Sequence, residues 1–290
     1  MHKTYRGRLA PSPTGLLHAG HAATFLQASL LCSKNCGQMV YRNDDLDSDR
    51  CKLLFSQAAL EDLHWLGLHW HEGPDVGGPF APYSQAERGA FYHAAFESLR
   101  TAGLIYPCKC SRREVASALS APHAIDEEPL YSGDCRPQEP VVFEENTGLN
   151  WRFRIPGPEK ISFIDGRLGE QSAVAGTDFG DFLVWRKDGV PSYQLACAVD
   201  DALMGITEVV RGEDLVTSTF RQLLLLRALG YKAPAYHHCA LLTDSSGRRL
   251  AKRDAALSLQ TLRAQGCTPE DVRRLIEKAA QQPRPSVNTP

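Results

Sequence analysis

The stretch that decides the fold is Arg8-Leu-Ala-Pro-Ser-Pro-Thr-Gly-Leu-Leu-His-Ala-Gly-His21. An apolar run ends at two prolines and a glycine, and H-x-G-H then opens a helix-like segment. This order predicts a strand, a tight turn and a helix N-terminus, where free backbone N–H groups and the helix dipole favour a bound phosphate. Gly20 has no Cβ, so the rings of His18 and His21 can approach the backbone closely.

Strand-like and helix-like segments alternate outward from this stretch. The spacing of apolar residues predicts strands at 5–10, 39–42, 104–106, 182–185 and 208–211, and helices at 22–31, 52–66, 86–101 and 221–229. Such alternation is typical of βαβ units, so we expect an α/β protein with a parallel sheet.

The alternation breaks in the middle of the chain, where cysteines, prolines and acidic loops take over. Strand-like pieces at 151–155 and 161–164 remain, which indicates an insertion between two halves of the sheet. After the second half we expect two short helices and a disordered, proline-containing tail from 281 onward. The expected domains are a first catalytic half (1–106), an insertion (107–180), a second catalytic half (181–254) and a helical C-terminal segment (255–290).

Composition narrows the class of protein. With 43% hydrophobic and 23% charged residues, the 290-residue chain resembles ordinary water-soluble proteins with room for about two domains. It has no apolar run of membrane-spanning length and no signal peptide at its start, so we expect a cytoplasmic protein. Nine cysteines, an odd number, favour buried thiols or metal ligands over disulfides. A net charge of −2 disfavours a uniformly basic nucleic-acid surface but permits a local one.

The string Pro11-Ser-Pro-Thr-Gly15, followed by His18-Ala-Gly-His21, resembles the first signature of the class I aminoacyl-tRNA synthetases, in the branch for glutamate and glutamine. The resemblance implies a Rossmann-like catalytic domain that uses ATP with Mg²⁺ to activate an amino acid. It also implies that His18, Gly20 and His21 contact ATP. Both histidines would then be catalytic, because they stabilise charge in the transition state.

A second basic segment, Asp244-Ser-Ser-Gly-Arg-Arg-Leu-Ala-Lys-Arg253, is able to clamp phosphates, because Gly247 permits a turn and four cations follow. It resembles the family's K-M-S-K-S signature. The resemblance implies an ATP-binding loop with Lys252 as the catalytic cation, formed by Arg249, Leu250, Ala251, Lys252 and Arg253. Ala251 replaces the usual serine, so one hydroxyl contact is missing. The alternative is a solvated surface loop. We also expect His238, just before the loop, to approach the nucleotide.

Two arginines are candidates for recognising an acidic amino acid. Arg8 and Arg211 can each grip a carboxylate in a bidentate manner, and glutamate has two carboxylates. Asp44 stands where glutamyl relatives usually have glutamate, and the resemblance implies that it holds the ammonium group with one methylene less reach. The implied glutamate-binding set is Arg8, Leu9, Ala10, Pro11, Ser12, Asp44, Tyr193 and Arg211. For Tyr193 the alternative is simple packing.

The stretch Asp200-Asp-Ala-Leu-Met-Gly-Ile-Thr-Glu-Val-Val-Arg-Gly-Glu-Asp214 also matches a family motif, V-D-D-x-x-M-G-I-T-H-V-I-R-G-x-D. Two readings of its carboxylates remain open. They hold the ribose or orient the pocket arginine, or they cap helices.

Cys108-Lys-Cys110 is followed by Tyr131 and Cys135. Three thiolates leave a tetrahedral zinc site one ligand short, and a phenolate could fill the fourth position. Relatives of the glutamyl-queuosine type carry C-x-C…Y-x-x-x-C here. The resemblance therefore implies one structural zinc ion held by Cys108, Cys110, Tyr131 and Cys135, which would staple the insertion. The alternative is three unrelated buried cysteines.

Only 37 residues follow Arg253, so we expect the chain to lack the long anticodon-reading part of full glutamyl-tRNA synthetases. A chain of this size has a radius of gyration of about 19 Å, too small to grip both distal ends of a tRNA. This combination resembles the glutamyl-queuosine tRNA(Asp) synthetases. The resemblance implies activation of L-glutamate without tRNA and its transfer to the queuosine cyclopentenediol at the wobble position, with the tRNA(Asp) anticodon arm as partner of a monomer.

Three other functions remain open. A truncated glutamyl-tRNA synthetase would charge the 3′ end of tRNA. A small-molecule ligase or nucleotidyltransferase would share H-x-G-H but not the acidic-substrate pocket. A non-catalytic tRNA-binding paralogue would have lost signature residues, and Asp44 and Ala251 are the departures that hint at one.

Overall fold

The chain begins with the strand–helix–strand unit that the first motif predicts. The computed structural model describes residues 4–110, 131, 133–144, 148–242 and 258–280. Strand β1 (Arg6–Leu9) pairs in parallel with β2 (Gln38–Tyr41), and helix α1 (Ala19–Lys34) connects them. The α1 helix starts three residues before the predicted position because His18 caps its N-terminus.

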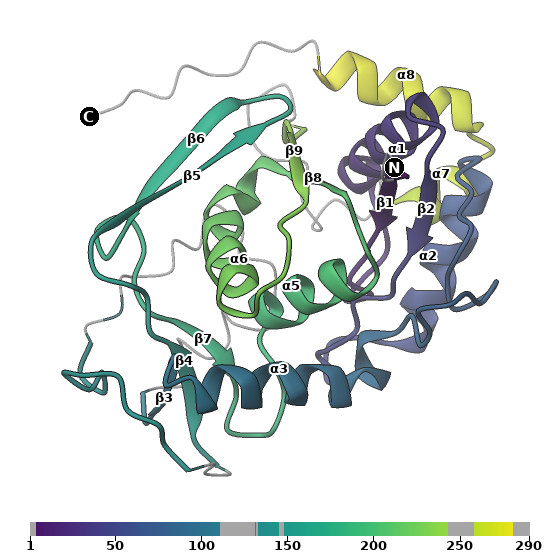
Figure 1. Ribbon diagram of the computed structural model, residues 1–290. Helices are drawn as coiled ribbons and strands as arrows, with labels where there is room; N and C mark the ends of the chain where they lie inside the picture. Colours follow the sequence, from purple (N-terminus) through teal and green to yellow (C-terminus); the bar gives the residue numbers. More distant parts are fainter. Residues whose placement is uncertain (1–3, 111–130, 132, 145–147, 243–257, 281–290) are drawn as a thin grey trace.

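Two strands from the second half of the chain continue this parallel arrangement. β8 (Glu208–Gly212) pairs in parallel with β9 (Ala235–Cys239), and helix α6 (Val216–Ala228) connects them. The backbone N–H of Thr207 donates to the carbonyl of Arg6 at 2.9 Å, which brings the start of β8 against β1. Strands more than 190 residues apart in sequence therefore lie side by side, and the predicted Rossmann-like parallel core is confirmed (Figure 1).

Antiparallel strands form the middle of the chain. One sheet has the order β3 (Ile105–Cys108), β4 (Asn150–Phe153), β7 (Phe182–Trp185). The antiparallel hairpin of β5 (Glu159–Asp165) and β6 (Gly169–Ala175) belongs to another sheet, of the order β6, β5, β9, β8. The last residue of β5, Asp165, pairs with Tyr236 of β9, so the hairpin is attached directly to the parallel strands.

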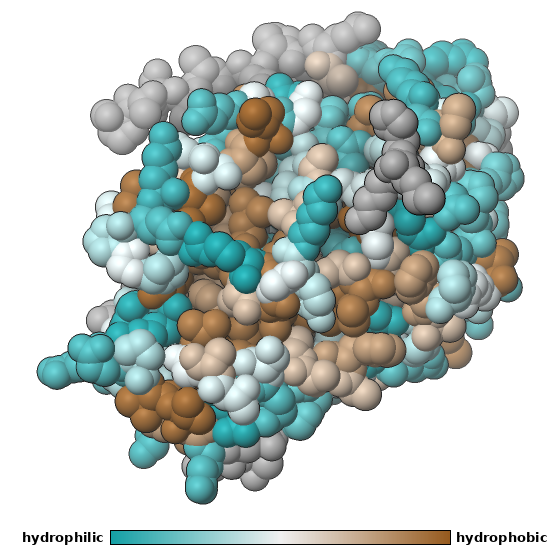
Figure 2. Space-filling view, viewed as in Figure 1, coloured by the Kyte–Doolittle hydropathy of each residue, from teal (hydrophilic) through white to brown (hydrophobic). Residues whose placement is uncertain are grey.

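Helices cover these sheets in two groups around the two larger of three apolar cores. The third and smallest core is formed by Val40, Tyr83, Met204, Ile206, Val209 and Tyr236. α1 packs with the helices α2 (Leu53–Trp65), α7 (Leu259–Ala264) and α8 (Pro269–Ala280) beside β1 and β2. α3 (Gly89–Thr101), α5 (Tyr193–Leu203) and α6 pack with β3, β4 and β7. In Figure 1 the first group lies at the right and upper right and the second at the centre and bottom, and short 3₁₀ turns at Gln85–Glu87 and Glu213–Leu215 precede α3 and α6. Apolar side chains gather in the middle of this face, while its right and upper rim is largely hydrophilic (Figure 2).

The sequence predicted most of these elements but missed three of them. The pattern did not indicate α5, in which every residue from Tyr193 to Asp201 is buried. It also missed β6, whose sequence Gly-Glu-Gln-Ser-Ala-Val-Ala is mostly polar, and β9, which carries adjacent histidines. The predicted domain limits remain predictions, and the predicted disordered tail lies outside the described residues.

Candidate active site

The turn between β1 and α1 forms one wall of a pocket. His18 caps α1, its Nδ1 accepting the backbone N–H of Gly20 at 3.1 Å. The His21 Nδ1 atom accepts the backbone N–H of His18 at 3.3 Å, and the two rings are tilted by 34° with centroids 3.9 Å apart. No acidic residue occupies the first turn of α1, so nothing there opposes an anion at the helix N-terminus.

Arg8 lies on the floor of the pocket and is almost fully buried. Its Nη1 donates to the carbonyl of Val210 on β8 at 2.8 Å, and its Nε lies 3.4 Å from Asp201 Oδ1 on α5. Although burial by itself opposes ionisation, the charges of Arg42 and Arg8 hold the pKa of Asp201 below its ordinary value. Asp201 is therefore a buried anion that anchors Arg8 beneath the pocket.

Arg211, in β8, is the second arginine of the pocket, and α6 and β9 hold it from behind. Its Nη1 donates to Gln222 Oε1 at 2.8 Å and its Nη2 to Thr219 Oγ1 at 2.7 Å. Its Nε points at Nε2 of His238 at 3.3 Å. His238 is fully buried behind Arg211, so the expectation that it approaches the nucleotide is wrong. His238 contacts Arg211, an arginine of the pocket, instead of the nucleotide.

Asp44 and Tyr193 complete the predicted pocket. The Asp44 carboxylate pairs with Arg42 at 2.6 Å, and burial raises its pKa to about 6 in spite of that cation. Cys197 Sγ lies 3.8 Å from the same carboxylate. Tyr193 opens α5 and is mostly buried, and burial raises its pKa far above the ordinary value, so its hydroxyl stays a neutral hydrogen-bond donor.

The structure brings most of the predicted residues into one pocket. The described members of the predicted sets that line it are Arg8, Ala10, Pro11, Ser12, His18, Gly20, His21, Asp44, Tyr193 and Arg211. Leu9 does not line it, because strand alternation turns its side chain into the α1 core, and only its backbone remains for a ligand. Arg249, Leu250, Ala251, Lys252 and Arg253, the predicted ATP loop, lie outside the described residues.

Sequence reasoning missed several lining residues. Thr14, Thr24 and Phe25 belong to the first motif and its helix, and Asp47, Arg50 and Cys51 lie in the loop before α2. Gly212 ends β8 and Leu215 follows it, beside Asp214, which the sequence had offered within the Asp200–Asp214 motif; Ala240, Leu241 and Leu242 follow β9. The last group could have been found by recognising β9, because residues just after parallel strands gather at one edge of a sheet.

Asp200 and Asp201 of the Asp200–Asp214 motif do not cap a helix, because both lie in the last turns of α5. Asp200 accepts hydrogen bonds from Arg88 at 2.6 Å and from the hydroxyl of Tyr92 at 2.8 Å. Asp201 contacts Arg8 and accepts from Arg42 at 2.7 Å. Asp201 therefore fits the reading in which the motif orients a pocket arginine.

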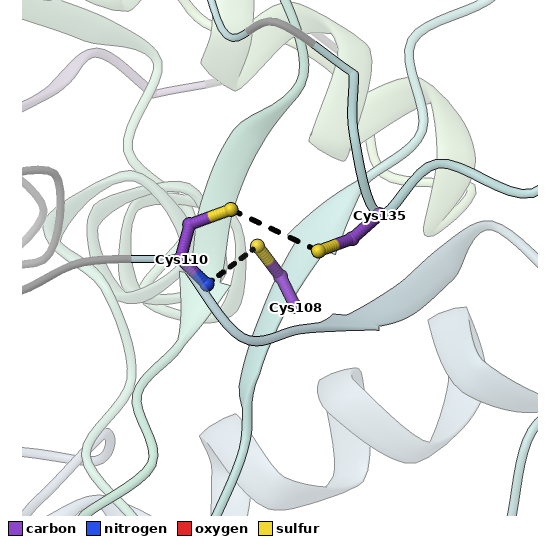
Figure 3. A group of neighbouring side chains, drawn as sticks. All are labelled: Cys108, Cys110 and Cys135. Carbon is purple, nitrogen blue, oxygen red and sulfur yellow. Dashed lines mark hydrogen bonds between the residues drawn. The ribbon is translucent and has the colours of Figure 1, made fainter.

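A second cluster lies away from the pocket, at the end of β3. The Sγ atoms of Cys108, Cys110 and Cys135 all lie within 4.8 Å of one another, and all three cysteines are free thiols (Figure 3). The hydroxyl of Tyr131 lies 3.5 Å from Cys108 Sγ and 3.4 Å from Cys110 Sγ. Arg152 donates to Cys108 Sγ at 3.3 Å.

These distances suit a metal ion. Zn–S bonds of about 2.3 Å in a tetrahedron put two sulfurs about 3.8 Å apart. Cys110 Sγ and Cys135 Sγ are 3.8 Å apart. The cluster therefore offers three sulfur ligands and one oxygen ligand, and this set is able to hold a metal ion.

Within the described part of the chain, no helix is long and apolar enough to cross a membrane.

Comparison with known proteins gives a consistent result. The family model of class I tRNA synthetases (E and Q), catalytic domain, matches residues 4–285. A protein of Symbiobacterium thermophilum named glutamyl-Q tRNA(Asp) synthetase is 47% identical over 92% of this chain and 83% of its own length. Glutamate–tRNA ligase 1 of Halorhodospira halophila is 43% identical over 92% of this chain but 57% of its own length.

Solved structures agree with this result. The glutamate-tRNA synthetase of Elizabethkingia anophelis matches with a TM-score of 0.73 and 31% identity, over 87% of this chain. The present chain spans about half the length of that protein, 53%.

Proposed function

This chain belongs to the class I tRNA synthetases of the E and Q branch, and we propose that it attaches glutamate to queuosine in tRNA(Asp). The observation that carries the proposal is the pair of buried arginines, Arg8 and Arg211, facing one pocket with the histidine turn. Two fixed guanidiniums suit the two carboxylates of glutamate, and the helix N-terminus beside them suits a nucleotide phosphate. The Symbiobacterium thermophilum relative, of which this chain covers 83%, is named for this reaction.

Activation would begin with a glutamate α-carboxylate oxygen attacking the α-phosphorus of Mg²⁺-bound ATP. A new C–O–P bond forms, the bond between the α-phosphorus and the bridging oxygen breaks, and pyrophosphate leaves with that bond's electron pair. Charge builds up on the phosphoryl oxygens, so preorganised donors accelerate the step. We assign this role to His18 and His21 at the α1 N-terminus, and to Lys252 from the second signature.

Glutamate would be held from three sides. One carboxylate would bind the outward N–H groups of Arg211, and Arg8 would supply a second cation near the other. The Asp44 carboxylate would accept from the ammonium group, which would favour its charged form, and the Tyr193 hydroxyl would donate to a carboxylate. The backbone of Ala10, Pro11 and Ser12 would close the pocket at its nucleotide side.

Transfer would follow at the same pocket. One hydroxyl of the cyclopentenediol attacks the glutamyl carbonyl, an ester forms, the hydroxyl proton is released, and AMP leaves. We propose that the chain acts as a monomer and that the anticodon arm of tRNA(Asp) enters over the pocket.

We propose zinc as the metal of the cysteine cluster, held by Cys108, Cys110, Cys135 and the Tyr131 oxygen. A closed site of this kind has a structural role, because its ligands come from segments far apart in sequence and bind together only in the fold. The cluster lies at the β3 end rather than in the pocket, so no chemical step is assigned to the ion.

The test uses labelled glutamate with tRNA(Asp) prepared with and without queuosine. We expect label only on the queuosine-containing tRNA, and in the anticodon-loop fragment after ribonuclease digestion at mildly acidic pH, which preserves the ester. Label in the 3′-terminal fragment, or equal label on both tRNAs, would instead support the truncated glutamyl-tRNA synthetase. Glutamate-dependent exchange of pyrophosphate into ATP without tRNA separates a catalyst from a tRNA-binding paralogue.

A further inference from the structure

His238 has a role that neither signature motif assigns. It lies in β9, is fully buried, and has a different partner at each ring nitrogen. Its Nδ1 lies 2.6 Å from Asp165 Oδ2, at the end of β5. Its Nε2 faces Arg211 Nε at 3.3 Å and the Thr219 hydroxyl at 3.0 Å. The imidazole thus stands between a carboxylate and an arginine of the pocket.

The partners fix the tautomer of this ring. Asp165 also accepts the backbone N–H groups of Arg167 and Leu168, each at 2.9 Å, and that of His238 at 3.0 Å. A carboxylate in such a cradle is an acceptor, and these donors hold the pKa of Asp165 below its ordinary value although burial opposes this. The proton must therefore sit on Nδ1 of His238.

The other nitrogen must then offer a lone pair. Arg211 Nε carries a hydrogen and can only donate, so a hydrogen on His238 Nε2 would place two N–H groups against each other. Burial and the charge of Arg211 lower the pKa of His238 to about 4 although Asp165 opposes this, which keeps the ring neutral near pH 7. The neutral ring with its proton on Nδ1 satisfies both neighbours.

This arrangement determines how Arg211 faces the pocket. Its guanidinium has five N–H bonds, and among the described residues three are directed at Gln222, Thr219 and His238. One hydrogen then remains on each Nη. Two parallel N–H bonds on the two Nη atoms are the fork that binds one carboxylate in a bidentate manner.

We propose that His238, locked by Asp165, is a positioning residue that orients the carboxylate-binding fork of Arg211 and so sets the affinity for the acidic amino acid. The inference rests on the proposed function, because it assumes that the carboxylate in the fork is that of glutamate. It adds that the β5–β6 hairpin, which lies outside the pocket, supports substrate recognition through its last residue on β5, Asp165.

The test compares two substitutions at His238 with the same two at His237. His237 is the neighbouring residue of β9, points to the other side of the strand and lies against Gly166. His238→Leu removes the acceptor, whereas His238→Gln retains an acceptor at the far end of the side chain. His237→Leu and His237→Gln control for general disturbance of the strand.

Pyrophosphate exchange with full-length protein gives the readout. We expect His238→Leu to raise the KM for glutamate about 10- to 100-fold, the range expected for losing a hydrogen bond to a charged group. The KM for ATP should stay within about twofold of wild type, and His238→Gln should recover most of the glutamate affinity. Both His237 variants should resemble wild type.

Several results would overturn this role. The role would be excluded if His238→Leu had the same KM for glutamate as the His237→Leu control. It would also be excluded if His238→Leu raised the KM for glutamate and the KM for ATP equally. If His238→Leu does not fold, ¹⁵N spectra of the wild type decide the tautomer, and a proton on Nε2 near pH 7 contradicts the proposal. If wild-type protein shows no glutamate-dependent exchange, the proposed function itself fails, and that result is distinct from the others.

Discussion

At the scale of single residues, His18 has two roles that substitutions can separate. Its ring caps α1 and also lines the pocket. Asparagine is among the best N-cap residues but lacks an imidazole. We expect His18→Asn to keep the free energy of unfolding within about 0.5 kcal/mol of wild type while lowering the rate of adenylate formation about 10- to 1,000-fold. Urea unfolding and pyrophosphate exchange measure the two effects.

His18→Ala is the matched comparison, since it removes both the cap and the ring. It should lose about 1 kcal/mol of stability in addition to the same activity. If His18→Asn retained wild-type exchange, the ring would have no part in catalysis and the assignment of the histidine turn would be wrong.

Single residues also show what sequence can and cannot predict about the site. His18, His21 and Arg211 were found because they lie in contiguous motifs that resemble those of the synthetase family. Asp201 and His238 gain their meaning from partners far away, Arg8 and Asp165. Such pairs depend on how strands are ordered in the sheet, which the local pattern does not contain.

At the scale of elements, Asp62 joins α2 to α7. Its side chain is fully buried, neither oxygen accepts a hydrogen bond from a described residue, and Arg263 lies 3.5 Å away. Burial raises the pKa of Asp62 from 3.8 to about 6 although Arg263 opposes this. The unfolded chain therefore releases this proton at lower pH than the native protein, so the contribution of Asp62 to stability falls as pH rises from about 4 to 6.

We therefore expect Asp62→Asn to stabilise the protein by about 1–3 kcal/mol at pH 8, because the amide needs no ionisation. The gain should vanish near pH 4, where native Asp62 is protonated. Urea unfolding at both pH values measures it. Glu61→Gln is the control, because Glu61 pairs with the same Arg263 at 3.1 Å but is exposed. A gain at pH 8 that persisted unchanged at pH 4 would contradict the assigned titration.

The cysteine cluster ties β3 to the loop that carries Cys135. If it holds zinc, Cys110→Ser should lower the zinc content from about one ion per chain to near zero and reduce the melting temperature. Elemental analysis and thermal unfolding, with and without a chelator, measure both. Cys36→Ser is the control, because Cys36 is exposed and far from the cluster in sequence. Equal zinc content in the two variants would exclude Cys110 as a ligand.

Burial by itself does not separate the helices that the sequence predicts from the one that it misses. α6 is largely buried, yet its run of leucines and the glycine that closes it, Gly230, indicated a helix. The α5 helix is buried on both faces and was missed, although it contributes Tyr193 and Asp201 to the site.

At the scale of the whole molecule, buried ion pairs connect the two larger apolar cores. Arg42, which follows β2 in the first core, has no exposed surface and donates to Asp44 at 2.6 Å and to Asp201 of α5 at 2.7 Å. Removing one partner of a buried pair leaves an uncompensated charge and typically destabilises a protein by about 3–5 kcal/mol. In this protein the loss of stability would affect the junction between the cores rather than the interior of either core.

We therefore expect Arg42→Met to lower the free energy of unfolding by about 3–5 kcal/mol and to weaken the coupling between the cores. Tryptophans report on each core: Trp65 and Trp70 on the first, Trp151 and Trp185 on the second. Two background proteins that keep Arg42 would each retain one tryptophan pair and carry phenylalanine in place of the other pair. Their urea unfolding transitions should coincide. The Arg42→Met variants should give separated ones.

The control for this last prediction is Arg227→Met, which removes an arginine from the exposed pair with Glu159. Exposed pairs contribute about 0–1 kcal/mol, so its transitions should stay coincident and near the wild-type midpoint. Because Arg42 lies behind Asp44, the uncoupled variant should also lose glutamate-dependent exchange before either core unfolds. Coincident transitions in Arg42→Met, or exchange that persists until the cores melt, would mean that apolar contacts and not the buried charges hold the two halves of the pocket together.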